Sequence, residues 1–134
     1  DNAKINVKSV NGTLGTNIEW EWYNNVLTLT GEGKVTGFKS GGSQPWYQYR
    51  TTIKEVVISE GITDIGSRVF HSSVPVMVKL HLPSTLKKIE TGAFYQANRL
   101  AYVYYNGSKE DWANVSIDSN SAIYINKAEF VTKD

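Results

Sequence analysis

The stretch that decides the fold is residues 53–100, which read IKEVVISEGITDIGSRVFHSSVPV over 53–76 and MVKLHLPSTLKKIETGAFYQANRL over 77–100. Six apolar positions in the first half are apolar again 24 residues later. The matched pairs are Ile53 and Met77, Val56 and Leu80, Ile58 and Leu82, Ile62 and Leu86, Ile65 and Ile89, and Phe70 and Phe94. A partial third copy follows with a step of 23, at Leu100, Val103 and Tyr105. A fixed period of this length is typical of a repeat architecture.

Each unit predicts a short strand, a turn, and a brief helical or irregular arm that ends in phenylalanine. The predicted strands are residues 56–58, 80–82 and 103–105. One unit is too small to bury its own apolar side, whereas stacked units bury it together, with their strands paired in parallel. The sequence therefore predicts a short stack of parallel strands, and both ends of such a stack must be covered.

The N-terminal flank predicts a hairpin. Apolar and acidic residues alternate over 18–22, which is the pattern of a half-buried strand. Asn24-Asn25 suits a two-residue turn, and residues 26–30 return as the second strand.

The C-terminal flank predicts a helix and a closing strand. Ser108 suits the position before a helix, and Glu110 and Asp111 fall in its first turn, where negative charge is favourable. We expect a last strand around Ala122 to Ile125 to close the stack.

Composition excludes several classes of protein. The chain has 134 residues, of which 40% are hydrophobic, so it can bury a core and is not a disordered tail. Its 14 basic and 13 acidic residues nearly cancel, which gives no reason to expect nucleic acid or an anionic membrane as partner. It has no cysteine and no apolar run long enough to predict a membrane span. We expect that any secretion signal has been removed or lies outside this sequence.

Several segments together resemble the BspA-like leucine-rich-repeat family of bacterial surface and secreted proteins. The likeness extends from about Gly15 to Ile125, and the combination is specific although each piece alone is weak. The segments that carry it are Gly15–Trp20, Leu27–Gly33, Pro45–Arg50, Ile53–Ile58, Gly61–Gly66 with Phe70, Val103–Gly107 and Glu110–Trp112.

The resemblance implies a single leucine-rich-repeat domain over residues 1–134. Its fold class is a β-rich α+β solenoid with short parallel strands, an N-terminal β-hairpin cap over 1–50, repeats over 51–105 and a C-terminal cap over 106–134. Family members often carry many more repeats, so this chain offers little concave surface. The resemblance further implies surface display, adhesion to host or matrix molecules, or service as a module of a larger secreted protein.

The sequence argues against catalysis. Its two histidines, His71 and His81, lie in no recognisable nucleophile or metal motif. Glu60 and Asp64 are spaced across a predicted turn, where solvated surface carboxylates are the expected interpretation. We therefore predict no enzyme activity, no cofactor and no metal site.

Three of the four tryptophans, Trp20, Trp46 and Trp112, fall where the family pattern has a structural aromatic residue. Trp22 lies at the end of the predicted hairpin beside Tyr23, where an aliphatic residue would be enough for packing. We predict Trp22 and Tyr23 as a candidate aromatic binding edge, because exposed rings can serve as platforms for sugars.

Strand geometry predicts a second candidate surface. The residues between the inward positions of each strand point outward, and stacking aligns them across neighbouring strands. The two predicted outward rows are Glu55, Lys79 and Tyr102, and Val57, His81 and Tyr104. Aromatic and hydrogen-bonding groups on a rigid sheet suit recognition of a protein or a glycan. The alternative is a solvated face with ordinary cross-strand pairs.

These observations favour a non-catalytic recognition module that binds a protein or host-matrix partner outside a bacterial cell or on its surface. The first alternative is a carbohydrate-binding module of a secreted glycan-degrading protein, and the second is a structural spacer. We expect a monomer that binds an extracellular protein or polysaccharide, with no nucleic-acid partner and no membrane span.

Overall fold

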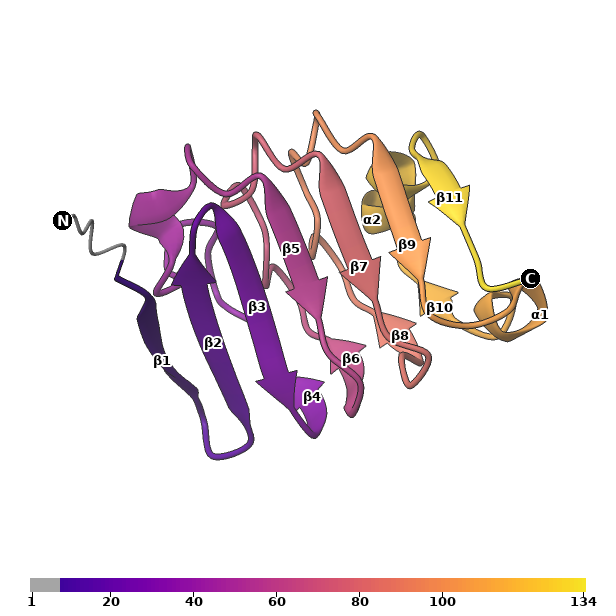
Figure 1. Ribbon diagram of the computed structural model, residues 1–134, viewed down its shortest axis with the longest axis horizontal. Helices are drawn as coiled ribbons and strands as arrows, with labels where there is room; N and C mark the ends of the chain where they lie inside the picture. The colour runs from indigo at the N-terminus through magenta and orange to yellow at the C-terminus, as the bar shows by residue number, and fades with distance from the viewer. Residues whose placement is uncertain (1–7) are drawn as a thin grey trace, which may run out of the picture.

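The computed structural model describes residues 8–134, which form two β-sheets around one core (Figure 1). In the large sheet the strand order is β1-β2-β3-β5-β7-β9-β11. These strands are β1 (Val10–Leu14), β2 (Ile18–Tyr23), β3 (Val26–Gly31), β5 (Glu55–Ile58), β7 (Lys79–Leu82), β9 (Tyr102–Tyr105) and β11 (Glu129–Val131). The first seven residues of the predicted N-terminal cap lie outside the described residues.

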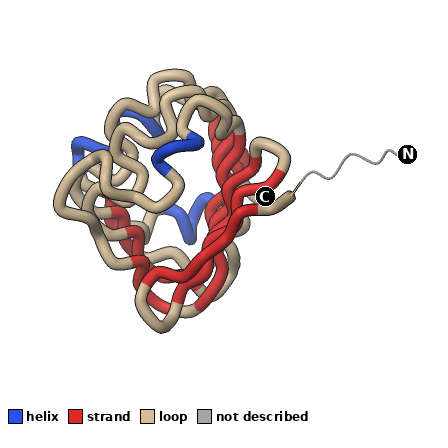
Figure 2. The backbone as a smooth tube through the Cα atoms, turned by 90° about the vertical axis from the view of Figure 1, so that its left-hand side faces the viewer, coloured by secondary structure: helices blue, strands red, loops and turns tan. Residues whose placement is uncertain are grey.

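The small sheet has the order β10-β8-β6-β4 and faces the large sheet across the core. Its strands are β4 (Gly33–Val35), β6 (Ile62–Ile65), β8 (Lys88–Ile89) and β10 (Ser116–Ile117). The helical segments of the described chain are short: the 3-10 turn η1 (Tyr47–Tyr49) and the helices α1 (Lys109–Trp112) and α2 (Ser119–Ile125). Figure 2 shows the two sheets on separate sides of the core, with helices and loops closing the remainder.

The predicted strands of the repeats are confirmed. From β3 onward the large sheet is parallel, and Val56 is paired with Leu80, which is paired with Val103. The step of 24 and then 23 residues in the sequence is thus the step from one strand to the next in space. All fifteen apolar positions of the repeat pattern are buried, the most exposed being Leu100 at 7%.

The arms between the strands are only partly as predicted. The arms were predicted to be helical or irregular, and they are irregular. Each arm also adds a short strand, β6 or β8, to a second sheet that was not predicted. Ile65 and Ile89 are paired in that sheet and both point into the core. Strands of two to four residues are too short to show a periodic pattern of their own.

Aromatic rings fill the core behind the arms. Trp46 is fully buried, and its ring centroid lies 5.7 Å from that of Phe70, which stacks on Phe94 at 5.2 Å. The indole N–H of Trp46 donates a hydrogen bond to the buried hydroxyl of Ser73 at 3.2 Å. A buried indole needs such a partner, because leaving the N–H unpaired would cost free energy.

The N-terminal hairpin is confirmed, and it has one strand more than predicted. Asn24 and Asn25 have φ values of 51° and 69°, the left-handed pair that matches a two-residue turn to the twist of its strands. The added strand is β1, which pairs with β2 along its length. Gly12 of β1 lies against the Trp20 indole, where a Cβ atom would be 2.8 Å from Nε1.

The end of the chain corrects the sequence analysis. Ser108 caps α1, as predicted, and the structure adds a capping box between Ser108 and Asp111. The strand expected at Ala122 to Ile125 is wrong, since these residues belong to α2, and the last strand is β11. Asp118 caps α2 by accepting a hydrogen bond from the backbone N–H of Asn120 at 3.0 Å. Ser121 and Ile125, one helical turn apart, are the buried residues of α2.

Within residues 8–134, none of the helices has the length and apolar character needed to cross a membrane.

Candidate functional site

The outward surface of the large sheet, called here the outer face, carries the two predicted rows. Glu55 pairs with Lys79 and Lys79 with Tyr102, while Val57 pairs with His81 and His81 with Tyr104. Their side chains alternate along each strand with the buried residues Val56, Leu80 and Val103. The predicted register and direction of these six residues are therefore confirmed, and their role in binding stays a prediction.

Both rows continue onto strands that the sequence analysis did not include in the site. The row of His81 extends through Thr28 to Glu21 on one side and to Val131 on the other. The row of Lys79 ends at Glu129 on β11. Strand β11 was missed because three residues give too short an alternation to recognise. Glu21 and Thr28 were recognisable as outward residues of the hairpin, but the pairing of β3 with β5 was needed to align them.

The side chains around His81 hold one another in place. The imidazole Nε2 lies 2.5 Å from the Glu55 carboxylate, and the imidazole ring stacks on the Tyr104 ring with centroids 5.0 Å apart and planes 20° apart. Tyr102 and Tyr104 lie two residues apart on β9, with nearly parallel rings 6.3 Å apart. Such contacts restrict the rotamers of the exposed rings, so that less conformational entropy is lost when a partner binds.

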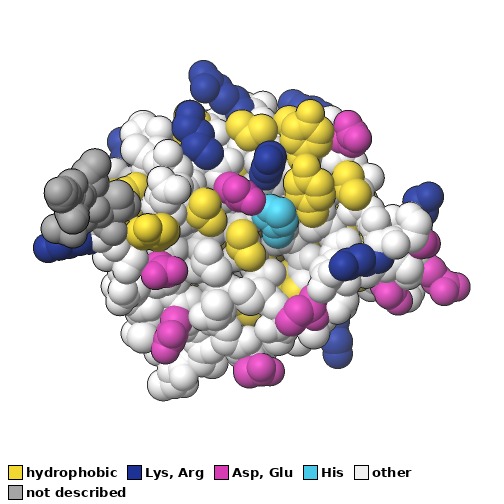
Figure 3. Space-filling model, viewed as in Figure 1, with side chains coloured by type: hydrophobic (Ala, Val, Ile, Leu, Met, Phe, Trp, Pro, Cys, Tyr) yellow, Lys and Arg dark blue, Asp and Glu magenta, His cyan; other side chains and the backbone are white. Residues whose placement is uncertain are grey.

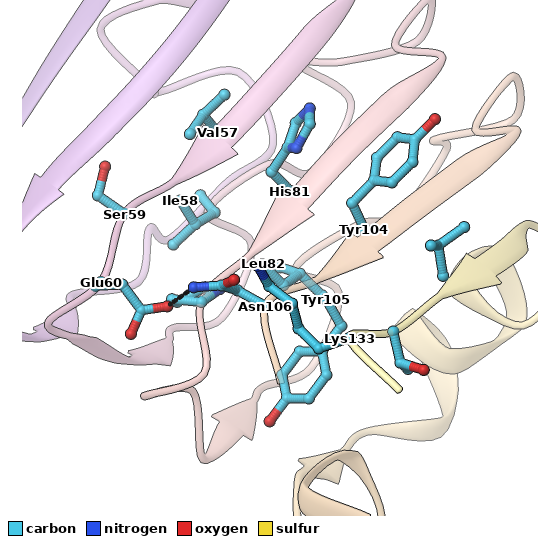
Figure 4. A pocket seen from close by; sticks show the side chains of 13 residues that line it. Val57, Ile58, Ser59, Glu60, His81, Leu82, Tyr104, Tyr105, Asn106 and Lys133 are labelled. Carbon is cyan, nitrogen blue, oxygen red and sulfur yellow. Dashed lines mark hydrogen bonds between the residues drawn. The ribbon is translucent and has the colours of Figure 1, made fainter. Parts of the chain in front are cut away.

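A depression of about 510 Å³ lies on the outer face toward the carboxyl ends of the strands (Figure 4). Val57, His81 and Tyr104 lie along one side of it, and the polar residues Glu60, Asn106 and Lys133 lie at the other. It is open to solvent, and its lining combines an apolar surface with a few polar groups. Hydrophobic side chains gather on this face around a histidine in the space-filling view (Figure 3).

Glu60 connects the turns at the lower rim of the depression. Its carboxylate accepts hydrogen bonds from the Ser84 N–H at 2.8 Å, the Ser84 hydroxyl at 2.7 Å and the Asn106 amide at 2.7 Å. Burial raises the pKa of Glu60, but these hydrogen bonds and the positive charge of Lys133 outweigh burial, so its pKa lies below the usual value. The Asp64 carboxylate instead accepts from the Thr63 hydroxyl at 2.7 Å. The two carboxylates thus have separate structural partners.

Trp22 and Tyr23, the candidate aromatic edge, face different sides of the large sheet, and their role in binding stays a prediction. They are consecutive on β2 and point to opposite sides of the sheet. Trp22 is half-buried and stacks on Tyr49, with centroids 4.7 Å apart and planes 13° apart. Tyr23 points outward and is 47% exposed. Only Tyr23 therefore adds to the outer face.

The other tryptophans lie where a structural role was predicted. Trp20 and Trp46 are buried and contact each other edge to face at 5.8 Å. Trp112 packs on Phe130 at 4.6 Å and on Tyr105 at 5.1 Å, beneath the last strands. Their indole faces are used for packing.

His71 lies on the segment between β6 and β7, away from the row of His81. Its ring stacks on Tyr95 at 4.6 Å, and Nδ1 lies 3.0 Å from the Ser72 hydroxyl. Burial, together with the positive charge of Arg68, lowers the pKa of His71. Among the described residues no group of three or more histidine or acidic side chains is placed to hold a metal ion.

Comparison with known families identifies the chain. The sequence model of the BspA type leucine rich repeat region (6 copies) matches residues 43–130, well over half of the sequence. This protein belongs to the BspA-type leucine-rich-repeat family. The matched region begins just before Trp46 and ends within β11, so it includes the repeats and most of the C-terminal segment.

A solved structure supports this membership of the BspA-type family. A leucine-rich repeat protein from Eubacterium ventriosum is similar, with 25% sequence identity and a TM-score of 0.63. The similarity covers 75% of this chain and 32% of that protein, so this chain spans about a third of its length. The comparison with curated proteins gave no match. Leucine-rich-repeat families typically serve in protein interaction and are typically non-catalytic, and BspA-type repeats are typically found in bacterial surface proteins.

Proposed function

We propose that this protein is a non-catalytic recognition module that binds a protein partner through the outer face, outside a bacterial cell or on its surface. The observation that carries the proposal is the group of His81 on β7 with Tyr104 and Tyr102 on the neighbouring strand β9, in which His81 stacks on Tyr104 across the strands and Tyr102 lies nearly parallel to Tyr104. Tyrosine is enriched where protein interfaces concentrate their binding energy. Membership of the BspA-type family supports the same class of function.

The geometry of the rings favours a protein partner over a sugar. A sugar platform needs an aromatic face that is open to solvent. His81 and Tyr104 turn their faces toward each other, because their centroids lie only 5.0 Å apart with planes 20° apart. On its other side Tyr104 is paired with Val131 of β11. The two rings therefore cover one face of each other, which leaves less open aromatic face for a sugar, and the mixed polar and apolar side chains of the row suit a protein surface.

The proposed architecture is a short capped solenoid that acts as a monomer. The proposal is supported by the antiparallel strands β1 and β2, which extend the parallel stack at one end, and by the packing of Trp112 on Tyr105 near the other end, where β11 is the last strand. In this proposal residues 1–50 form the N-terminal cap, 51–105 the repeats and 106–134 the C-terminal cap. Such ends protect the edges of a repeat stack from unwanted strand pairing.

Binding to purified extracellular proteins tests the proposal. Collagen, fibronectin, laminin and fibrinogen would be immobilised separately, and binding of the folded domain would be measured by biolayer interferometry beside a glycan array. We expect saturable binding to at least one protein and at least a tenfold loss of affinity in the Tyr102→Ser/Tyr104→Ser variant. Binding to glycans alone would favour the carbohydrate-binding module, and no binding to either set would favour the spacer. Both results contradict the proposal.

The matched control for this variant is Tyr95→Ser. Tyr95 and Tyr102 are each 38% exposed, and the stacking of Tyr95 on His71 resembles that of Tyr104 on His81. However, Tyr95 lies on the segment after β8 and not on the large sheet. Tyr95→Ser should therefore bind like the wild type, and an equal loss in both variants would show that the outer face is not the binding surface.

A further inference from the structure

The outer face carries a charge opposite in sign to that of the whole chain. Its outward positions on the seven strands hold four glutamates and one lysine, a net charge of −3 with His81 neutral, whereas the whole chain has +1. The charged positions are Glu19, Glu21, Glu55, Glu129 and Lys79. A surface of this sign attracts cationic partners and repels anionic ones.

Two of the four glutamates lie apart from the aromatic side chains along the rows, whereas Glu55 contacts His81 and Glu129 is paired with Tyr102. Glu19 and Glu21 lie on β2, and each is flanked on β1 and β3 by uncharged side chains, namely Thr13 and Thr30, and Asn11 and Thr28. The other end of the Glu21 row holds His81, Tyr104 and Val131. In Figure 3 acidic side chains lie on the left and lower parts of this face and also beside the histidine and at the upper right, while the larger group of hydrophobic side chains lies to the right of the centre, with others at the left.

We propose that the outer face binds an extended segment of a partner protein that carries a lysine or arginine at one end and an aromatic or aliphatic side chain at the other. This inference rests on the proposed function and adds the chemistry and direction of the partner. The segment crosses the strands along the Glu21 row, with its basic side chain over Glu19 and Glu21 and its apolar side chain beside His81 and Tyr104. Charge complementarity selects this occupant over an acidic segment.

The spacing of the two parts follows from sheet geometry. From β2 to β9 the row crosses four strand intervals. At about 4.8 Å for each interval, the two parts lie about 19 Å apart. An extended chain covers that distance in about six residues. The basic and apolar side chains of the partner should therefore lie about six positions apart.

A random library of twelve-residue peptides displayed on phage is the probe that tests the inference. Selections would be made on the wild type, on Glu19→Gln/Glu21→Gln and on Tyr102→Ser/Tyr104→Ser, with Glu110→Gln as a control because Glu110 lies on α1. Peptides selected on the wild type and on the control should contain at least twice the lysine and arginine of the input library, with an apolar residue about six positions away. This basic preference should vanish on Glu19→Gln/Glu21→Gln, while the apolar preference remains.

The outcomes separate this inference from the proposed function. Apolar peptides that depend on Tyr102 and Tyr104 but show no excess of basic residues would overturn the inference and leave the proposed function standing. Peptides that are recovered equally on all variants, or no enriched peptides at all, would contradict both. Persistence of the basic preference on Glu19→Gln/Glu21→Gln would place the cation elsewhere and overturn the inference.

Discussion

Phe70 and Phe94 are 24 residues apart in the sequence, and their rings stack with centroids 5.2 Å apart and planes 18° apart. Both side chains are fully buried. This contact shows what the repeat means physically: each unit places the same ring against the ring of the next unit. The stack is continued by Trp46, whose centroid lies 5.7 Å from that of Phe70.

Phe70→Ala should be among the most destabilising single substitutions. Removing a fully buried ring loses its transfer free energy and leaves a cavity, with a cost of about 3–5 kcal/mol. Urea unfolding followed by tryptophan fluorescence would measure the change. Tyr95→Ala, one residue after Phe94 but 38% exposed, is the control and should cost about 1 kcal/mol. Equal losses of unfolding free energy in the two variants would show that the buried ring stack stabilises the fold no more than an exposed ring does.

The hairpin turn gives a second prediction. Asn25 has a φ of 69°, which glycine adopts freely and a β-branched residue does not. Asn25→Gly should keep the free energy of unfolding within about 0.5 kcal/mol of the wild type. Asn25→Val should lower it by about 1–2 kcal/mol. If the two variants were equally stable in urea, that result would contradict the left-handed conformation of Asn25.

Glu60 predicts a dependence of stability on acid. Its pKa is lower in the folded protein than the ordinary value of 4.5, so its contribution to stability is present above that value and is lost as the pH falls through the folded pKa. Because the carboxylate is exposed, we expect this contribution to be about 1 kcal/mol or less. The difference in unfolding free energy between the wild type and Glu60→Gln should shrink between pH 6 and pH 3. A difference that stays constant over this pH range would contradict the lowered pKa of Glu60.

Helix α2 gives a prediction that separates it from the strand expected from the sequence. Asp118→Ala removes the side chain that caps the helix and should cost about 1 kcal/mol. Asp118→Asn keeps a capping oxygen and should retain most of the stability. Thermal unfolding of the two variants would measure the difference. If they lost the same amount, the capping interaction would not be the source of the stability.

The strands of the repeats were predictable because apolar residues recur at a fixed period. Strand alternation also predicts Lys79, His81 and Tyr104 on one outward surface, since the buried neighbours along each strand fix the direction of a side chain. The same reasoning failed at Ala122 to Ile125. There the short apolar run had no period long enough to separate strand from helix, and the structure has a helix capped by Asp118.

Other parts of the site depend on contacts between distant segments. Glu60 binds Asn106, which is 46 residues away, and only the stacking of the repeats brings the two turns together. Trp22 was grouped with Tyr23 because the two are adjacent, yet its stacking on Tyr49 turns it toward the core. The second sheet could not be predicted for a similar reason. Strands β8 and β10 have two residues each and are recognisable only from their pairing with other strands.

The most direct test of the central claim, that the outer face recognises a protein, is a titration followed by NMR. The domain, labelled with nitrogen-15, would be titrated separately with soluble fragments of the four extracellular proteins named above. We predict that at least one titration perturbs the backbone amides of residues 79–82 and 102–105 more than those of residues 92–97. Perturbation centred on 92–97, or none with any of the four proteins, would contradict the claim.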